Sequence, residues 1–140
     1  MDYAVKVALA GQVPEMITLD RQRTMYGGKA VAAGEVIYLF DSEMSGGSGL
    51  CARGEVVAAQ LLARQAGAAR QVPLVNLTIR RAGLVLRPLA KAALRRFTDW
   101  GDGRAETELN FKFYRQATDK LVGITPRAAT FLQEYFRDLV

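Results

Sequence analysis

Histidine is missing altogether from this chain of 140 residues, and cysteine occurs once, as Cys51. The first absence removes the side chain that most often serves as a general base or a metal ligand near neutral pH. We therefore expect no structural zinc site, no internal disulfide and no cofactor. Cys51 lies in a predicted strand with no histidine to activate it, so we interpret it as a small buried residue rather than a nucleophile.

Long apolar stretches are also missing. The sequence contains no run of 18 apolar residues that could cross a membrane. Its first residues lack the basic and apolar pattern of a signal peptide. The composition, 50% hydrophobic and 24% charged, is typical of a globular protein. We expect one domain spanning residues 1–140, a cytoplasmic location and no membrane partner.

Acidic residues are absent from the middle of the chain. Residues 56–98 contain eight basic residues and no acidic one, so the net charge of +5 originates there. A solvated face is one interpretation, and a surface that meets a polyanion is the other. Under the second interpretation a basic rim is predicted from Arg80, Arg81, Arg87, Lys91 and Arg95, with Arg96 beside them.

The segment from Gly34 to Gln60 has the strongest local pattern. Two runs of β-branched and aromatic residues flank a glycine cluster, which is typical of a β-hairpin. The first run, residues 36–40, is apolar on both faces and is therefore expected to be buried on both sides. In the second run, Gly54 indicates a bulge or a close approach of another backbone.

The remaining elements follow from periodicity and capping signals. Alternation predicts strands at residues 3–10, 74–81 and 109–116. A first-turn proline predicts helices at residues 87–100 and 125–139, with Thr125 as the N-cap of the second. Residues 15–26 are ambiguous, and a short helix could begin near Met16. Strands mixed with peripheral helices indicate an α+β fold, which we predict to be a small curled β-barrel of mainly antiparallel strands.

The hairpin resembles the EVE domains of the PUA-like superfamily. The motifs that carry the resemblance are Gly34-Glu35, Tyr38, Phe40 and Ser42, followed by Gly49-Leu50, Gly54 and Val56-Val57. Arg23-Thr24 with Gly34-Glu35 is similar to the related ASCH domains. The resemblance implies a single PUA-like domain with a cleft between sheet and helices that binds RNA or a modified base. Tyr3 and Asp41 stand where EVE domains commonly carry tryptophan and histidine.

Two sets of residues are candidates for the binding site. Alternation places Asn110, Lys112 and Tyr114 on one face of the strand predicted at 109–116, with Arg115 and Gln116 beyond, where they could read and stack a base. An exposed strand face is the alternative. A loop folded over the end of the hairpin could form a polar pocket from Arg21, Arg23, Thr24, Tyr26, Lys29, Ser42 and Glu43; the alternative is a polar loop.

We predict a nucleic-acid-binding module that recognises RNA or a modified base. The ASCH resemblance implies another possibility, an amidohydrolase acting on a modified nucleoside through Arg23 or Lys29 with Thr24 and Glu43. A third possibility is a protein-interaction module whose basic face is incidental. Binding to single-stranded oligonucleotides that weakens steeply with salt separates the first from the third.

Overall fold

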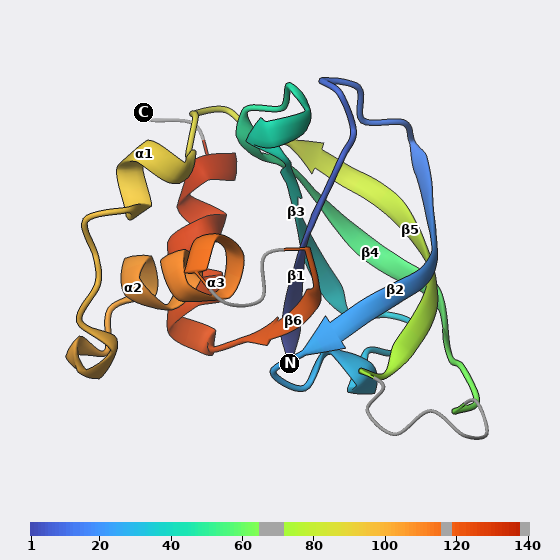
Figure 1. Cartoon of the computed structure of the whole chain (residues 1–140). Helices are drawn as coiled ribbons and strands as arrows, with labels where there is room; N and C mark the ends of the chain where they lie inside the picture. Colours follow the sequence, from blue (N-terminus) through green and yellow to red (C-terminus); the bar gives the residue numbers. More distant parts are fainter. Residues whose placement is uncertain (65–71, 116–118, 138–140) are drawn as a thin grey trace.

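The computed structural model of the chain describes residues 1–64, 72–115 and 119–137. Within these ranges six strands close into a barrel in the order β1-β3-β4-β5-β2-β6 (Figure 1). They are β1 (Asp2–Val7), β2 (Met16–Met25), β3 (Val36–Asp41), β4 (Gly49–Leu61), β5 (Leu74–Leu84) and β6 (Leu121–Ile124). The predicted small barrel is confirmed, whereas the short helix considered near Met16 is wrong, because that residue begins β2.

The sheet is mixed rather than uniform in direction. Among the described strands, β1 pairs with β3 and β2 with β6 in parallel, and the other four pairs are antiparallel. Parallel neighbours need a crossover connection, and the chain makes one by placing β2 on another part of the barrel before β3 returns beside β1. Most strand pairs are therefore antiparallel, as predicted, but the sheet also contains two parallel pairs that the prediction did not include, β1 with β3 and β2 with β6.

Strand β3 separates two hydrophobic clusters. Ile37 and Leu39 point into the barrel with side chains of the other strands, while Tyr38 and Phe40 pack against the helical layer. All four are fully buried, which confirms the expectation from the doubly apolar sequence. Successive strand residues face opposite sides, so one strand supplies both clusters.

The predicted irregularity at Gly54 is also confirmed. The register between β4 and β5 shifts at this residue, as expected of a β-bulge. A Cβ atom at this position would lie 2.6 Å from a methyl group of Ile79 and 2.8 Å from the Arg80 carbonyl oxygen. Only glycine permits this approach of β5, and the bulge helps the sheet to curl.

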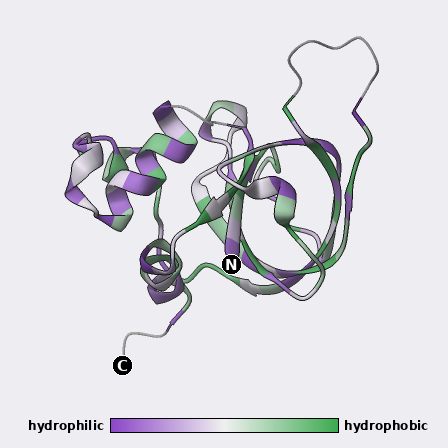
Figure 2. Ribbon diagram, turned by 90° about the horizontal axis from the view of Figure 1, so that it is seen from below, coloured by the Kyte–Doolittle hydropathy of each residue, from purple (hydrophilic) through white to green (hydrophobic). Residues whose placement is uncertain are grey.

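The helices gather on one side of the barrel, next to β1, β3 and β6 (Figures 1 and 2). They are α1 (Lys91–Leu94), α2 (Ala105–Asn110), which continues as a π-helical turn (Phe111–Arg115), and α3 (Pro126–Gln133). Short 3-10 helices occur at Gly28–Ala30, Glu43–Ser45, Trp100–Asp102 and Glu134–Phe136. None of the helices in the described ranges has the length and apolar character to cross a membrane.

The strand predicted at 109–116 is wrong, because this segment is helical. Leu109 and Phe113 are fully buried and lie four residues apart, which puts them on one helical face. Phe111, between them, is only partly buried. Apolar residues at every second position over such a short run fit either structure, and packing against β3 selected the helix. Gln116 lies outside the described residues.

The two predicted helices differ in outcome. The one expected at 87–100 shortens to a single α-helical turn, Lys91–Leu94, because Ala90 before it is extended and provides no side-chain cap. For α3 the prediction of its start is confirmed, since the Thr125 hydroxyl accepts a hydrogen bond from the Ala128 amide at 3.2 Å and Pro126 follows the cap. The α-helix ends at Gln133 and a 3-10 turn continues it to Phe136.

Candidate functional site

A groove runs between the barrel and the helices. It consists of two adjoining cavities, of about 770 Å³ and 440 Å³, that share the four lining residues Tyr26, Lys112, Thr125 and Pro126. The first cavity continues along β6 and α3, and the second along α2 toward Trp100. We call the two cavities together the helix–barrel groove.

Tyr26 reaches the groove through an unusual backbone turn. It directly follows β2 and has a φ of 51°, and Gly27 after it has a φ of 81°. Its carbonyl oxygen accepts a hydrogen bond from the Gly123 amide of β6 at 3.1 Å, which fixes the turn against the barrel. The ring lines both cavities, with the Lys112 ammonium 4.9 Å from its centroid. Burial raises the pKa of the Tyr26 hydroxyl above its usual value near 10.

Lys112 forms the floor of the groove. Its ammonium donates to Glu108 Oε2 at 3.0 Å and to the Gly123 carbonyl at 2.7 Å. Glu108 also accepts from the amide of Thr125 at 3.0 Å and from its hydroxyl at 2.5 Å. Buried charges require partners of this kind. The network joins α2, β6 and the start of α3, so the floor of the groove is preorganised.

A second polar cluster lies where β1 and β3 end. The Tyr114 hydroxyl donates to both carboxylate oxygens of Glu43, at 2.9 and 3.0 Å, and the Lys91 amide donates to the same carboxylate at 2.8 Å. The ammonium of buried Lys6 donates to the Phe113 carbonyl at 2.7 Å and lies 4.4 Å from the Tyr114 ring centroid. Burial lowers the pKa of Lys6, and the charges of Asp119 and Glu43 partly offset this effect. We call this the Glu43–Tyr114 cluster.

No protein-family model and no curated protein matches the sequence. Among solved structures, the DUF55 domain of human thymocyte nuclear protein 1 aligns with a TM-score of 0.66 and 10% identity, over 96% of this chain and 97% of that one. Human THYN1 protein in complex with DNA containing 5-methylcytosine aligns with a TM-score of 0.65 and 12% identity, over 98% of each chain. The chain shares the fold of this DUF55 domain. At this identity the comparison establishes the fold alone.

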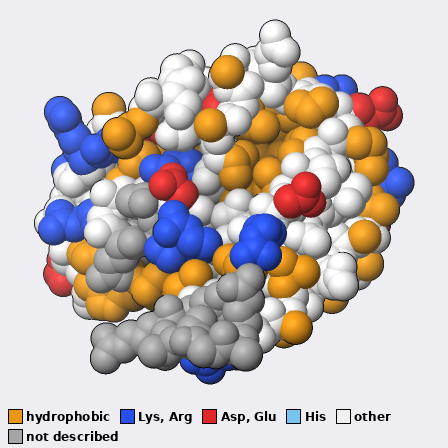
Figure 3. All heavy atoms as spheres, turned by 45° about the vertical axis from the view of Figure 1, so that its right-hand side comes forward, with side chains coloured by type: hydrophobic (Ala, Val, Ile, Leu, Met, Phe, Trp, Pro, Cys, Tyr) orange, Lys and Arg blue, Asp and Glu red, His pale blue; other side chains and the backbone are white. Residues whose placement is uncertain are grey.

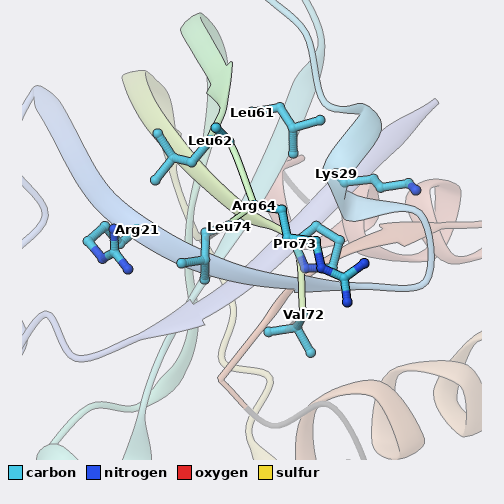
Figure 4. A pocket seen from close by; sticks show the side chains of 9 residues that line it. Arg21, Lys29, Leu61, Leu62, Arg64, Val72, Pro73 and Leu74 are labelled. Atoms are coloured by element: carbon cyan, nitrogen blue, oxygen red, sulfur yellow. The ribbon is translucent and has the colours of Figure 1, made fainter. Parts of the chain in front are cut away.

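The pocket predicted from residues 21–43 is divided among separate places on the barrel. Tyr26 lines the helix–barrel groove, whereas Ser42 and Glu43 lie at the end of β3. Arg21 and Lys29 line a separate cavity of about 320 Å³ (Figure 4). Arg23 is exposed on β2.

The proposed hydrolytic residues have structural partners. Thr24 is buried, and its hydroxyl donates to the Pro73 carbonyl at 2.8 Å. Glu43 instead binds Tyr114 and the Lys91 amide. Within the described ranges no hydrogen bond joins Thr24 to Glu43, and no group of three or more acidic or cysteine residues could hold a metal ion. The geometry therefore does not favour the amidohydrolase.

Residues expected on one strand face are separated by the helix. The Asn110 side chain donates to the Phe97 carbonyl at 3.0 Å and ties α2 to the irregular segment that follows α1. Lys112 reaches the groove, and Tyr114 reaches Glu43. Arg115 lies over the Phe111 ring at 5.1 Å on the outside of the layer.

The residues of the predicted basic rim are also dispersed, over both the barrel and the helical side. Arg80 pairs with Glu55 at 3.6 Å, and Arg81 donates to the Val13 carbonyl at 2.7 Å. Arg87 donates to the Glu134 carbonyl and Lys91 adjoins the Glu43–Tyr114 cluster, while Arg95 is exposed on the helical side. Figure 3, which views the barrel side, shows lysine and arginine side chains in separate groups rather than a continuous band.

Sequence reasoning missed Glu108, Thr125 and Trp100 as residues of the groove. The first left a usable signal, since Glu108 and Lys112 are four residues apart, the spacing of an ion pair on a helix. Thr125 was identified only as a helix cap, and Trp100 only as a helix end. Their place beside Tyr26 depends on the contact between helices and barrel.

Proposed function

We propose that this chain binds nucleic acid and receives one unstacked base in the helix–barrel groove. The observation that carries the proposal is the pairing of the Tyr26 ring with the Lys112 ammonium where the two cavities meet. The related fold of human THYN1 protein, solved in complex with DNA containing 5-methylcytosine, supports a modified base as the ligand.

The groove has the chemistry that a base requires. Its larger cavity, about 770 Å³, falls within the range of about 300–1,000 Å³ typical of small-molecule sites. Tyr26 and Pro126 offer flat apolar surfaces, and stacking on an aromatic ring contributes about 1–3 kcal/mol per base. Thr130 and Gln133 line the same cavity and can meet the polar edge of a base. Arg104 and Arg127 flank the second cavity, where phosphates would lie.

Fluorescence anisotropy with labelled nine-nucleotide single strands tests the proposal. The strands would be DNA with a central 5-methylcytosine, the same DNA with cytosine, and the matching RNA, each measured at several salt concentrations. We expect binding that weakens with salt because phosphate contacts release counterions. The comparison of the three strands reports the preference for a modified base or for RNA.

Two substitutions at Tyr26 separate stacking from other effects. Tyr26→Leu removes the aromatic ring and should weaken binding about 5- to 150-fold, the equivalent of 1–3 kcal/mol. Tyr26→Phe keeps the ring and should bind as the wild type does. If folded Tyr26→Leu binds all three strands with unchanged affinity, the groove is not the base site. If no strand binds at low salt, the protein-interaction alternative is favoured.

A further inference from the structure

The outer surface of the helical layer alternates aromatic rings with guanidinium groups. The Phe97 ring has the Arg96 and Arg104 guanidinium carbons 4.9 and 5.1 Å from its centroid. The Phe111 ring packs against another ring at 4.9 Å and against the Arg115 guanidinium at 5.1 Å. We call this set the arginine–aromatic ladder; its members are Arg96, Phe97, Trp100, Arg104, Phe111 and Arg115.

The acidic residues beside the ladder are occupied by internal contacts. Asp99 accepts from the Gly101 amide, and Asp102 accepts from the Arg104 amide and the Thr107 hydroxyl. Glu108 is held by Lys112 and Thr125, as described above.

The ladder therefore presents positive charge to solvent. Within the described part of the chain Arg96 and Arg115 form no ion pair, and both are exposed. Arg104 pairs with Glu106 at 3.3 Å, but its side chain is 57% exposed, and ion pairs of such exposed side chains are weak. These guanidinium groups remain available to an external anion.

Trp100 connects the ladder to the helix–barrel groove. Trp100 is the one tryptophan in the sequence. Although it is a large apolar residue, it is 53% exposed. It contacts Phe111 of the ladder and also lines the second cavity together with Arg104 and Tyr26. An exposed ring thus lines the groove and also contacts Phe111, over which the Arg115 guanidinium lies.

We infer that the ladder is a second binding surface, which holds the single-stranded segment flanking the base in the groove. Trp100 stacks on a neighbouring base, and Arg96, Arg104 and Arg115 contact phosphates. Positive charge favours a polyanion, and an exposed ring favours bases that are not already stacked and paired. The inference rests on the proposed function and adds that the flanking strand follows the helices, not β5, which carries Arg80 and Arg81.

The two surfaces can be tested separately with ligands of different length. The nucleotide 5-methyl-dCMP fits the groove alone, whereas a nine-nucleotide strand with a central 5-methylcytosine also reaches the ladder. Trp100→Ala should weaken binding of the nine-nucleotide strand about 5- to 150-fold. Arg96→Gln combined with Arg115→Gln, which changes two residues outside both cavities, should change 5-methyl-dCMP binding less than twofold. A nine-base-pair duplex should bind more weakly than the single strand. Circular dichroism confirms that each variant is folded.

The charges are tested independently of Trp100. Log affinity falls as log salt rises, and Arg96→Gln combined with Arg115→Gln should make this fall less steep by about 1.4. Each lost phosphate contact removes about 0.7 from the steepness on single strands. Arg80→Gln removes an exposed arginine from the barrel and should leave this salt dependence unchanged.

The outcomes distinguish failure of the ladder from failure of the groove. If 5-methyl-dCMP binds and neither the Trp100 variant nor the double arginine variant affects the nine-nucleotide strand, the ladder is overturned and the groove stands. If binding of the nine-nucleotide strand depends on the ladder residues but 5-methyl-dCMP does not bind, the groove proposal is overturned instead. If Arg80→Gln reduces the salt dependence as much as the double variant, the path over the helices is wrong.

Discussion

Replacing Lys112 by methionine removes the ammonium from the floor of the groove while keeping an unbranched apolar chain of similar length. The side chain is only 8% exposed, and the ammonium has two hydrogen-bond partners, Glu108 Oε2 and the Gly123 carbonyl. The substitution therefore leaves a carboxylate without its counter-charge and a strand carbonyl without that donor. We expect Lys112→Met to destabilise the fold even with no ligand present.

The magnitude follows from what each partner retains. Removing one member of a buried ion pair costs about 3–5 kcal/mol. Glu108 keeps its two donors from Thr125, so we expect the lower end of that range, about 3 kcal/mol. With an unfolding entropy of about 2.1 cal/mol/K per residue, a domain of this length loses about 3–4 °C in Tm per kcal/mol. Lys112→Met should thus lower Tm by about 10 °C.

Urea unfolding followed by far-ultraviolet circular dichroism measures this cost. Lys29→Met is the matched control, because Lys29 is exposed and its replacement should change the free energy of unfolding by less than about 0.5 kcal/mol. A double variant that also carries Glu108→Leu should lose less than the sum of the two single losses, since the removed groups contact one another. A Lys112→Met protein within about 1 kcal/mol of wild type would refute the buried network.

Three further predictions test the packing and the polar cluster. Phe113→Ala should cost about 3–5 kcal/mol in urea unfolding, because the buried ring packs 4.6 Å from that of Phe40; a cost below about 1 kcal/mol would contradict this packing. Burial raises the pKa of the Cys51 thiol to about 12, so a disulfide reagent at pH 8 should react much faster with urea-unfolded than with folded protein, and equal rates would show an accessible thiolate. Burial and the bond to Glu43 raise the pKa of the Tyr114 hydroxyl above its usual value near 10. The stability that this shift contributes is present below pH 10 and is lost as the pH rises further, because the unfolded chain ionises first. Tyr114→Phe should therefore flatten the fall in unfolding free energy above pH 10, and a profile as steep as that of wild type would exclude this coupling.

Local sequence signals are sufficient to predict the elements whose environment is encoded within a few residues. A strand that is apolar on both faces can be accommodated only where both sides are covered, and β3 lies between the barrel interior and the helical layer. Gly54 indicated the bulge, and Thr125 with Pro126 indicated the start of α3. Each of these signals depends on one residue type meeting a backbone or burial requirement within a few positions.

The helical structure of residues 109–115 and the positions of the charged side chains depend on tertiary contacts. Alternating apolar residues over a short stretch satisfy either a strand or two turns of helix, and the contact of Phe113 with Phe40 selects the helix. That choice turns Lys112 inward and sends Tyr114 to a different partner. The basic segment was visible in the sequence, but its residues follow a strand around the barrel and then cross to the helices, so they face several directions. The number of charges along a chain does not show which way each charged side chain points. The closed sheet and its helical layer set that direction.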